Sequence, residues 1–349
     1  MSFYDLAEKA LKLEREGKKI IRLNVGDTNM PTPQCVLGAA IKEMKIKKTN
    51  YGSSAGLLEL RKKIAERERC DVENVVIGPG SKHLLYGLLT MLAKKGDRVT
   101  LPTPTWPAYD MICKQLGLET TMIKTEMSNN WEFGKLELKG SKVCIICNPS
   151  NPTSKVYSQR CMEDAIKNAN DDGCHVILDE AYKALAFEEI SKYENAIRVR
   201  SFSKEFNIAN WRLGYVVAPA EIAKKLIAYN QITITCVQPF VQHAGIACIE
   251  NEKKLIAANL KVWKSRSSIA QKALKNAGFE FVTPDSGIYV FATHEKIKNA
   301  GEYAHKLLDN GVAIAPGNVF GGYEKHFRIC INQSEEILEK AVEVMADAL

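Results

Sequence analysis

Short apolar runs alternate with stretches of helical spacing through the middle of the chain. Runs at 75–77, 97–101, 143–147, 175–178 and 197–200 have the length and composition of strands. Each is followed by residues that break strands, such as glycine, proline, asparagine, aspartate or serine. Strands that alternate with helices favour a mostly parallel sheet with helices on both faces. The pattern therefore predicts an α/β fold with a large sheet sandwiched by helices.

The two ends of the chain carry a different pattern. Apolar residues at helical spacing over 4–17 precede a short strand-like run at 20–25. After about residue 253, a long helical stretch leads to three strand-like pieces and a closing helix, which is typical of a smaller α+β unit. At 349 residues the chain also exceeds the usual size of one domain. The sequence predicts a large domain over 31–252 and a small domain made of 1–30 and 253–349.

Composition narrows the class of protein. The hydrophobic content is 46% and the charged content is 26%, as in soluble globular proteins. The 48 basic and 41 acidic residues give a net charge of +7, and no basic patch with interleaved aromatic residues suggests nucleic-acid binding. No apolar run is long enough to span a bilayer, and the N-terminus lacks a signal-peptide pattern. We expect a cytoplasmic protein with no nucleic-acid and no membrane partner.

The ten cysteines and six histidines form no framework. Cys144 and Cys147 have C-x-x-C spacing, but both lie in a predicted strand, where residues three apart point to opposite faces. No second pair stands at zinc-site spacing, and the histidines are isolated. The sequence predicts buried thiols in a reducing compartment and no metal site.

Polar side chains with distinctive chemistry follow the predicted strands, where open α/β sheets bind ligands. Asn151 lies in the loop Asn-Pro-Ser-Asn-Pro-Thr at 148–153, and its two prolines can hold the amide rigidly in a cleft. Asp179 ends a strand, and Tyr182 follows three residues later. The carboxylate can pair with a protonated heteroaromatic nitrogen, and a role as a helix N-cap stays open.

The segment Ser201-Phe202-Ser203-Lys204, followed by Arg212, places a lysine near two hydroxyls and a guanidinium. Serine hydroxyls donate to phosphate oxygens, and an arginine binds phosphate through two parallel bonds. A lysine amine condenses with a carbonyl once its charge is suppressed by burial or by a neighbouring cation. This segment alone is equally consistent with a phosphorylated aldehyde site and with a solvated turn.

Three further positions are candidates for ligand binding. Gly80, Ser81 and Lys82 open a predicted helix, whose free N–H groups can bind an anion. Trp106 can stack on a planar ring or belong to the core. Arg328 lies inside an apolar strand and needs an anion from the protein or from a substrate.

In their order along the chain, these motifs resemble the fold-type I pyridoxal-phosphate (PLP) enzymes, specifically the class I/II aminotransferases. The resemblance spans nearly the whole chain and rests on Asn-Pro-x-Asn-Pro-Thr, Asp-x-x-Tyr, Ser-x-Ser-Lys and Arg-x-Gly-Tyr. It implies pyridoxal 5'-phosphate as cofactor, a seven-stranded-type sheet and a homodimer with shared active sites. The implied reaction (EC 2.6.1) transfers an amino group between an L-amino acid and a 2-oxo acid.

The resemblance also implies a role for each candidate residue. Lys204 would form the aldimine with the cofactor and move the proton at Cα, while Asp179 would bind the pyridinium nitrogen. Asn151 and Tyr182 would contact the cofactor's 3-oxygen, with Asn151 also beside the substrate, and Trp106 would stack on the ring. The phosphate would be held by Ser201, Ser203, Arg212, Gly80, Ser81 and Lys82, and by Tyr51 from a neighbouring subunit.

The same resemblance gives expectations for the substrate. Arg328 would bind the α-carboxylate with help from the backbone of Gly26. Lys82 matches a lysine of the prokaryotic-type aspartate aminotransferases that is associated with the distal carboxylate, which favours aspartate and glutamate, although it could serve only the phosphate or point to solvent. Histidinol-phosphate or aromatic aminotransferases, and a PLP-dependent decarboxylase or lyase, stay open as alternatives. Ser154 replaces a family glycine, and a positive φ costs serine more.

Overall fold

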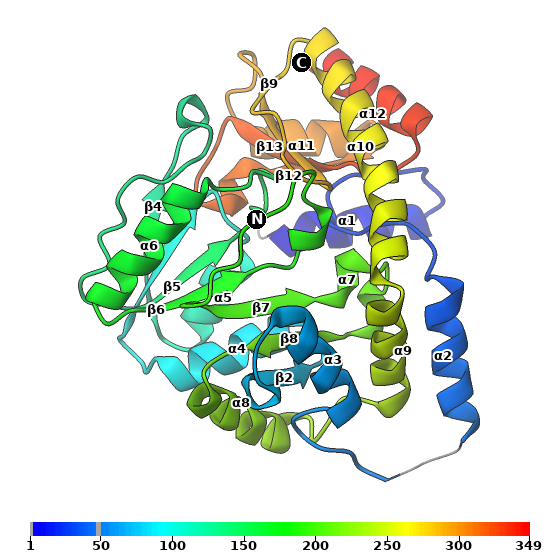
Figure 1. The fold of residues 1–349 in the computed structure, drawn as a ribbon. Coiled ribbons are helices and arrows are strands. Elements are labelled where there is room, and N and C mark those ends of the chain that lie inside the picture. Colours follow the sequence, from blue (N-terminus) through cyan, green and yellow to red (C-terminus); the bar gives the residue numbers. More distant parts are fainter. Residues whose placement is uncertain (1–2, 47–49) are drawn as a thin grey trace.

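The main sheet contains seven strands in the order β2-β8-β7-β6-β5-β3-β4 (Figure 1). A computed structural model describes residues 3–46 and 50–349. Residues 1–2 and 47–49, which belong to the two predicted domains, lie outside the described residues. The strands are β2 (Val75–Gly78), β3 (Arg98–Thr103), β4 (Glu119–Lys124), β5 (Ser141–Cys147), β6 (His175–Asp179), β7 (Ile197–Ser201) and β8 (Gly214–Val217).

The strand directions confirm the predicted mostly parallel sheet. Neighbouring strands from β4 through β3, β5 and β6 to β7 pair in parallel. Only β8, among the described strands of this sheet, runs antiparallel to both neighbours, β2 and β7. Its four residues carry no pattern that distinguishes one direction from the other, so the sequence did not predict the reversal.

Helices cover both faces of this sheet, as predicted. Alternate strand residues point to opposite faces, so Val76 and Val216 pack with the helices of one face while Val75 and Val217 pack with those of the other. The first face carries α4 (Ser81–Leu92), α5 (Ala108–Gln115) and α8 (Ala220–Thr233). The second carries α2 (Gln34–Lys45), α3 (Leu58–Glu68), α6 (Gln159–Asp171) and α9 (Pro239–Glu250).

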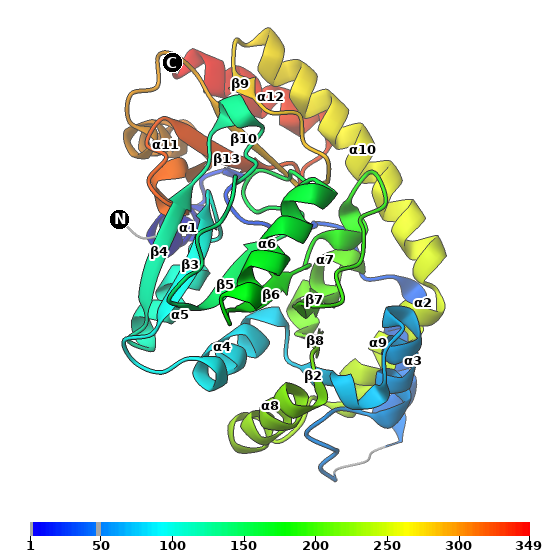
Figure 2. The same ribbon diagram turned by 60° about the vertical axis from the view of Figure 1, so that its left-hand side comes forward.

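The C-terminal part of the chain packs beside one end of the main sheet (Figures 1 and 2). Its four-stranded sheet has the order β12-β13-β10-β9 and is antiparallel. Those strands are β9 (Glu280–Phe281), β10 (Tyr289–Thr293), β12 (Ala315–Pro316) and β13 (His326–Cys330). The helices are α10 (Glu252–Asn276), which runs along both parts, α11 (Ala300–Asp309) and α12 (Glu335–Asp347).

The N-terminal segment joins this C-terminal part. The strand-like run at 20–25 forms only the short strand β1 (Ile21–Arg22), which pairs in parallel with β11 (Val312–Ala313). Leu6 and Ala10 of α1 (Phe3–Arg15) are buried in the same hydrophobic core as β10 and β13. The remaining short helices are α7 (Phe202–Glu205), η1 (Val72–Asn74), η2 (Met127–Asn129), η3 (Lys183–Leu185), η4 (Ala209–Trp211) and η5 (Gly317–Phe320).

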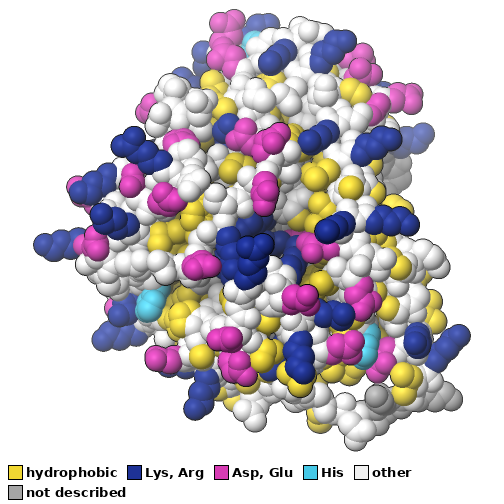
Figure 3. Space-filling view, viewed as in Figure 1, with side chains coloured by type: hydrophobic (Ala, Val, Ile, Leu, Met, Phe, Trp, Pro, Cys, Tyr) yellow, Lys and Arg dark blue, Asp and Glu magenta, His cyan; other side chains and the backbone are white. Residues whose placement is uncertain are grey.

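The structure shows where the C-x-x-C pair lies, whether a described helix could cross a bilayer, and how charged side chains are distributed on one face. Cys144 and Cys147 are free thiols that belong to hydrophobic clusters on opposite faces of β5, which confirms that they do not face each other. None of the helices within 3–46 and 50–349 is both long and apolar enough to cross a bilayer. On the face in Figure 3, basic and acidic side chains are interspersed, and Lys and Arg side chains gather in a hollow near its centre.

Candidate active site

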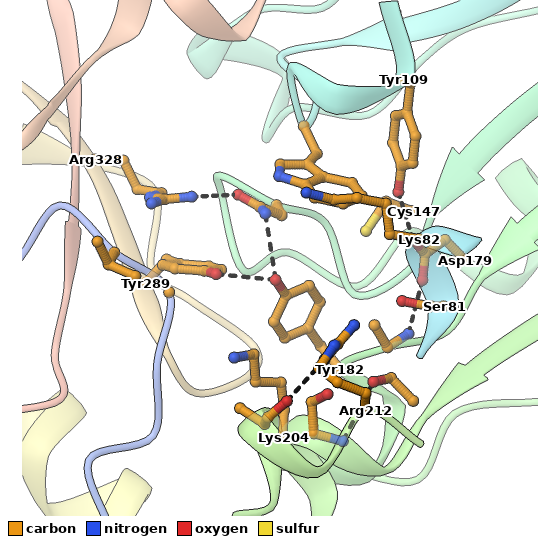
Figure 4. Close-up of a pocket in the computed structure, with 18 residues that line it drawn as sticks. Ser81, Lys82, Tyr109, Cys147, Asp179, Tyr182, Lys204, Arg212, Tyr289 and Arg328 are labelled. Carbon is orange, nitrogen blue, oxygen red and sulfur yellow. Dashed lines mark hydrogen bonds between the residues drawn. The ribbon is translucent and has the colours of Figure 1, made fainter. Parts of the chain in front are cut away.

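A pocket of about 250 Å³ lies beyond the carboxyl ends of β5, β6 and β7, between the main sheet and the C-terminal part (Figure 4). Parallel strands end at one edge of a sheet, so side chains that follow them in the sequence meet there. Most of the predicted residues line this pocket: Gly26, Ser81, Lys82, Trp106, Asn151, Asp179, Tyr182, Ser201, Ser203, Lys204, Arg212 and Arg328.

Lys204 lies on α7, the short helix that starts directly after β7, and its side chain points into the pocket (Figure 4). The hydroxyl of Ser201 caps this helix by accepting a hydrogen bond from the backbone N–H of Ser203 at 3.2 Å. Burial lowers the pKa of the Lys204 ammonium, and the nearby Asp27 carboxylate opposes that shift. A lowered pKa increases the neutral amine fraction, which is the nucleophilic form.

Asp179 is the last residue of β6 and is only 3% exposed. Its carboxylate accepts hydrogen bonds from the Tyr109 hydroxyl at 2.7 Å and from the backbone N–H of Ala181 at 3.0 Å. Burial raises the pKa of Asp179 to about 6, although both hydrogen bonds oppose the rise. A buried carboxylate with a raised pKa is stabilised by a cation placed against it.

A chain of hydrogen bonds links Arg328 to Tyr182 across the pocket (Figure 4). Arg328 donates to the Asn151 side-chain oxygen at 2.8 Å and to the backbone carbonyl of Asn24 at 2.6 Å. The Asn151 amide nitrogen donates to the Tyr182 hydroxyl at 3.3 Å. The Tyr289 hydroxyl lies 2.9 Å from the Tyr182 hydroxyl. The chain joins the C-terminal part to the loop after β5 and to the segment after β6.

The start of α4 and Arg212 lie at one corner of the pocket, where N–H groups and a guanidinium suit an anion. No side chain caps α4, so the first N–H groups of the helix are open to a ligand. Gly80 has a φ of 85°, and a Cβ there would lie 2.1 Å from the Arg212 guanidinium. A side chain at Gly80 would therefore displace Arg212, which donates to the backbone carbonyl of Ala209 at 2.7 Å. Gly80 shapes this corner without lining the pocket itself.

Trp106 and Lys82 form another wall. The Lys82 ammonium lies 5.1 Å from the centre of the Trp106 ring, within the range of a cation–π contact. Trp106 meets Tyr109 edge to face, with 5.4 Å between the ring centres. Trp106 therefore packs against Tyr109 and also lines the pocket.

The sequence missed several residues of the pocket, chiefly Tyr109, Cys147 and Tyr289. Each stands in an apolar segment and looks like a core residue, although its polar tip faces the cavity. The only available signal was Tyr109's position three residues after Trp106, at the start of a helix. Tyr51 is not among the residues that line the pocket of its own chain, and its side chain is 85% exposed.

Ser154 keeps the backbone conformation expected of the glycine that it replaces. Its φ is 56°, in the left-handed region that disfavours serine. The buried side chain is nonetheless used, because its hydroxyl accepts a hydrogen bond from the backbone N–H of Tyr289 at 3.1 Å. The replacement therefore adds a contact between the loop after β5 and the start of β10.

The comparisons with known proteins agree with this geometry. The profile of the family "Aminotransferase class I and II" matches residues 18–345. An aspartate aminotransferase of Thermococcus kodakarensis is 32% identical, over 94% of this chain and 88% of its own. This chain belongs to the class I and II aminotransferases. It is a PLP-dependent transferase of fold type I (EC 2.6.1), which confirms the predicted family, activity class and cofactor.

Two further relatives support the assignment to this aminotransferase family. A (5-formylfuran-3-yl)methyl phosphate transaminase of Methanocaldococcus jannaschii is 31% identical, over 99% of this chain and 95% of its own. The solved structure of an aspartate aminotransferase from Thermus thermophilus with maleate superposes with a TM-score of 0.95 at 25% identity, over 100% and 97% of the two chains. These relatives favour amino transfer over the decarboxylase or lyase alternative.

The pocket residues of this aminotransferase fit PLP chemically. PLP presents a phosphate, an aldehyde and a ring nitrogen that carries a proton. The uncapped start of α4 and Arg212 suit the phosphate, and Lys204 suits the aldehyde. Asp179 is a buried carboxylate whose raised pKa is relieved by a protonated ring nitrogen.

Proposed function

We propose that this aminotransferase moves the amino group between aspartate or glutamate and a 2-oxo acid. The charge of the pocket carries this proposal. Among the described residues that line it, four are basic and one is acidic, namely Lys82, Lys204, Arg212 and Arg328 against Asp179. Such an excess favours a ligand that brings several negative charges, here the cofactor's phosphate and a substrate with two carboxylates.

We further propose which residues hold the cofactor. Lys204 anchors the aldehyde, and Asp179 pairs with the ring nitrogen and keeps it protonated. The phosphate occupies the corner made by Arg212 and the start of α4. It is held there by the helix N-terminus at Gly80, Ser81 and Lys82 and by Ser201 and Ser203. Trp106 stacks on the ring, while Tyr182 and Asn151 donate to the 3-oxygen. The contacts described above support each placement.

The chain's own residues control the proton at the substrate Cα. When bound, PLP supplies the electron sink that stabilises negative charge at Cα. The Lys204 amine takes that proton and returns it, and burial favours this role because it lowers the lysine pKa and so raises the neutral fraction. Asp179 stays negative beside the protonated nitrogen, since a paired cation lowers the pKa of a carboxyl group.

The substrate is oriented by the two ends of the pocket. Arg328 is 1% exposed and binds the α-carboxylate, with Gly26 beside it and Asn151 fixing the guanidinium at 2.8 Å. Lys82 receives the distal carboxylate. Its position over Trp106 puts the ammonium at the opposite wall from Arg328 (Figure 4).

A screen of amino donors tests the proposed substrate. Aspartate and glutamate should give a higher kcat/KM than aromatic donors. Lys82→Ala should lower kcat/KM for the dicarboxylic donors roughly 10- to 100-fold, the cost of one charged hydrogen bond, and leave aromatic donors within about 3-fold. Lys94→Ala, an exposed lysine after α4, is the matched control. Equal losses for both donor classes would refute the role of Lys82.

A phosphate-bearing amino acceptor is a second candidate. The same four basic residues suit a phosphate ester, and one relative is named for such a substrate. The two candidates are separated by comparing 2-oxoglutarate with a phosphorylated aldehyde as acceptor. A higher kcat/KM with the phosphorylated aldehyde would replace our first proposal.

We propose that the enzyme is a homodimer in which Tyr51 reaches the phosphate of the partner's site. Tyr51 and Ile232 are large hydrophobic residues exposed by 85% and 84%. Their segments lie side by side, because the Gly52 N–H donates to the Cys236 sulfur at 3.3 Å. Two such exposed residues on adjoining segments suit a covered surface.

Hybrid dimers test this assembly. Lys204→Ala and Tyr51→Ala protomers should each be weakly active, and mixing them after dissociation should restore activity, because one site of the hybrid has both residues intact. A mixture no more active than its components, with a monomer in sedimentation, would exclude shared sites.

Two broader expectations remain proposals. We propose that residues 31–252 form a large cofactor-binding domain and that 1–30 with 253–349 form a small one, supported by the shared core of α1 and the C-terminal strands. We also propose a cytoplasmic location, supported by ten free cysteines in the described chain. Limited proteolysis near residue 252 and fractionation of cells test them.

A further inference from the structure

Tyr289 is a pocket residue that contacts two other pocket residues from different parts of the chain. It is the first residue of β10 and is buried. Its hydroxyl lies 2.9 Å from that of Tyr182, and the Arg328 guanidinium lies 4.2 Å from the centre of its ring. One side chain therefore touches both the residue proposed for the cofactor's 3-oxygen and the residue proposed for the substrate carboxylate.

The geometry points to Tyr289 as a positioning residue with two separable roles. We propose that its hydroxyl donates to Tyr182 and so strengthens the hydrogen bond that Tyr182 donates to the cofactor. Its ring meanwhile holds the Arg328 guanidinium for the substrate carboxylate. The inference rests on the proposed roles of Tyr182 and Arg328, and it adds the residue that couples them.

The number of protons on the two phenols decides which tyrosine donates the hydrogen bond between them. A phenol oxygen has one proton to donate and two positions to accept. The Asn151 amide fills one accepting position on Tyr182, at 3.3 Å. If Tyr182 gives its own proton to the 3-oxygen, the contact at 2.9 Å leaves Tyr289 as the donor to the second position. Burial raises the pKa of both phenols, so both keep their protons at neutral pH.

Packing holds the Tyr289 hydroxyl in this position. A Cβ built on Gly26 would lie 1.8 Å from that hydroxyl, so the backbone of Gly26 closes one side of it. The hydroxyl of Ser154 accepts from the Tyr289 backbone N–H at 3.1 Å and fixes the start of β10. The absence of a side chain at Gly26 is therefore what gives the phenol room to reach Tyr182.

Loss of the hydrogen bond from Tyr289 to Tyr182 should change the pH at which the bound cofactor loses a proton. Tyr182 stabilises negative charge on the 3-oxygen, and a hydrogen bond onto Tyr182 makes it a stronger donor. Without the hydrogen bond from Tyr289, the nitrogen that joins Lys204 to the cofactor keeps its proton up to a higher pH. The other titratable groups around Lys204 are Asp27, Cys330, Arg212 and Arg328, and those around the two phenols are Arg328, Cys330 and Cys147.

Two variants separate the roles. Tyr289→Phe keeps the ring and should raise the pH midpoint of the bound cofactor's visible absorbance by about 0.3–1 unit without substrate, with KM changed less than about 3-fold. Tyr289→Leu also loses the cation–π contact and should raise KM for the amino donor roughly 5- to 30-fold. Tyr303→Phe, a buried tyrosine of the same core that donates to the Met345 carbonyl at 2.6 Å, should change neither.

Tyr182→Phe distinguishes failure of the inference from failure of the proposed function. An upward shift in Tyr182→Phe with an unchanged midpoint in Tyr289→Phe would overturn our inference and leave the proposed role of Tyr182 intact. An unchanged pH midpoint in both variants would overturn our inference about Tyr289 and also the proposed role of Tyr182. If Tyr289→Phe does not fold, Gly26→Ala decides the question, because its Cβ displaces the Tyr289 hydroxyl and should produce the same upward shift.

Discussion

Two groups of charged residues lie side by side around the ends of β6 and β7. Residues that are adjacent in the sequence belong to different groups. Asp179, Ser201 and Lys204 line the pocket. Glu180, Arg200 and Glu205, each adjacent to one of these, belong instead to a buried ion-pair network. Its members are the four basic residues Arg67, Lys183, Arg198 and Arg200 and the four acidic residues Glu68, Glu180, Glu205 and Glu252.

The ion-pair network contains as many basic as acidic side chains, whereas the pocket lining has more basic than acidic ones. Arg200 is within 2.6 Å of Glu205 and within 3.6 Å of Glu180, and Tyr215 donates to Glu68 at 2.5 Å. The pocket lining, among the described residues, has four basic side chains and one acidic one. Charges that neutralise each other can fix a fold, while an excess of one sign favours an outside ligand. The network therefore fixes the ends of β6 and β7, while the excess of basic side chains in the pocket suits an anionic ligand.

The largest expected difference is between Lys204 and Lys183. Lys204→Ala should lower kcat by at least about 10³-fold, because no other group would move the Cα proton. Lys183→Ala removes a lysine that pairs with Glu180 at 2.6 Å, and kcat should fall less than about 10-fold. Steady-state kinetics on both variants checks this. Similar losses of kcat would mean that the two groups are not functionally distinct.

Arg200 should contribute more than Arg212 to the stability of the fold, and Arg212 should contribute more to PLP binding. Arg200→Met leaves buried carboxylates without their partner and should lower the free energy of unfolding by about 3–5 kcal/mol. Arg212→Met should cost the apoprotein less than about 1 kcal/mol and instead weaken PLP binding. Urea unfolding of the apoproteins and PLP titration give the two quantities. A larger loss of stability in Arg212→Met would contradict the comparison.

The pH dependence of stability should have opposite signs at Asp179 and Glu68. Burial raises the pKa of Asp179 to about 6, so the apoprotein should lose stability as pH rises from the ordinary aspartate pKa of about 4 through 6. Asp179→Asn should therefore stabilise the apoprotein by about 1–3 kcal/mol at pH 8 and have no effect below about pH 4.

Glu68 provides the counterpart. It lies between arginines, chiefly Arg200 and Arg198, and its pKa is lowered to about 2 despite burial. Its stabilisation is full above the ordinary glutamate pKa of about 4.5 and is lost as pH falls toward 2. Glu68→Gln should destabilise the apoprotein at neutral pH, with the difference closing in acid. Chemical unfolding at several pH values tests both variants, and curves of the same sign would exclude our assignment.

The smallest expected difference is that between two variants of Ser154. Ser154→Ala keeps the strained φ of 56° and loses the hydrogen bond to the Tyr289 N–H, so it should cost about 1–3 kcal/mol. Ser154→Gly loses the same bond but relieves the strain, and it should cost about 1 kcal/mol less than Ser154→Ala. Equal stabilities of the two variants would show that the backbone is not strained there.

The sequence predicted the sheet and most of the pocket because both follow from strand ends. Asp179 and Ser201 could be placed because each stands at the end of a predicted strand. Tyr109 and Tyr289 could not, since a tyrosine in an apolar segment has the same pattern whether its hydroxyl faces a ligand or the core. The network did leave a signal that was not used, because Arg198 and Arg200 alternate within a buried strand and require carboxylates nearby.

The most direct test of the account is the covalent attachment of PLP to Lys204. The loaded enzyme is treated with borohydride, digested, and analysed by mass spectrometry for the lysine that carries the reduced cofactor. We predict one modified lysine per chain, Lys204, together with loss of the visible absorbance, and no label in Lys204→Ala. A label on Lys82 or Lys183, or an unlabelled chain, would contradict the assignment of the pocket.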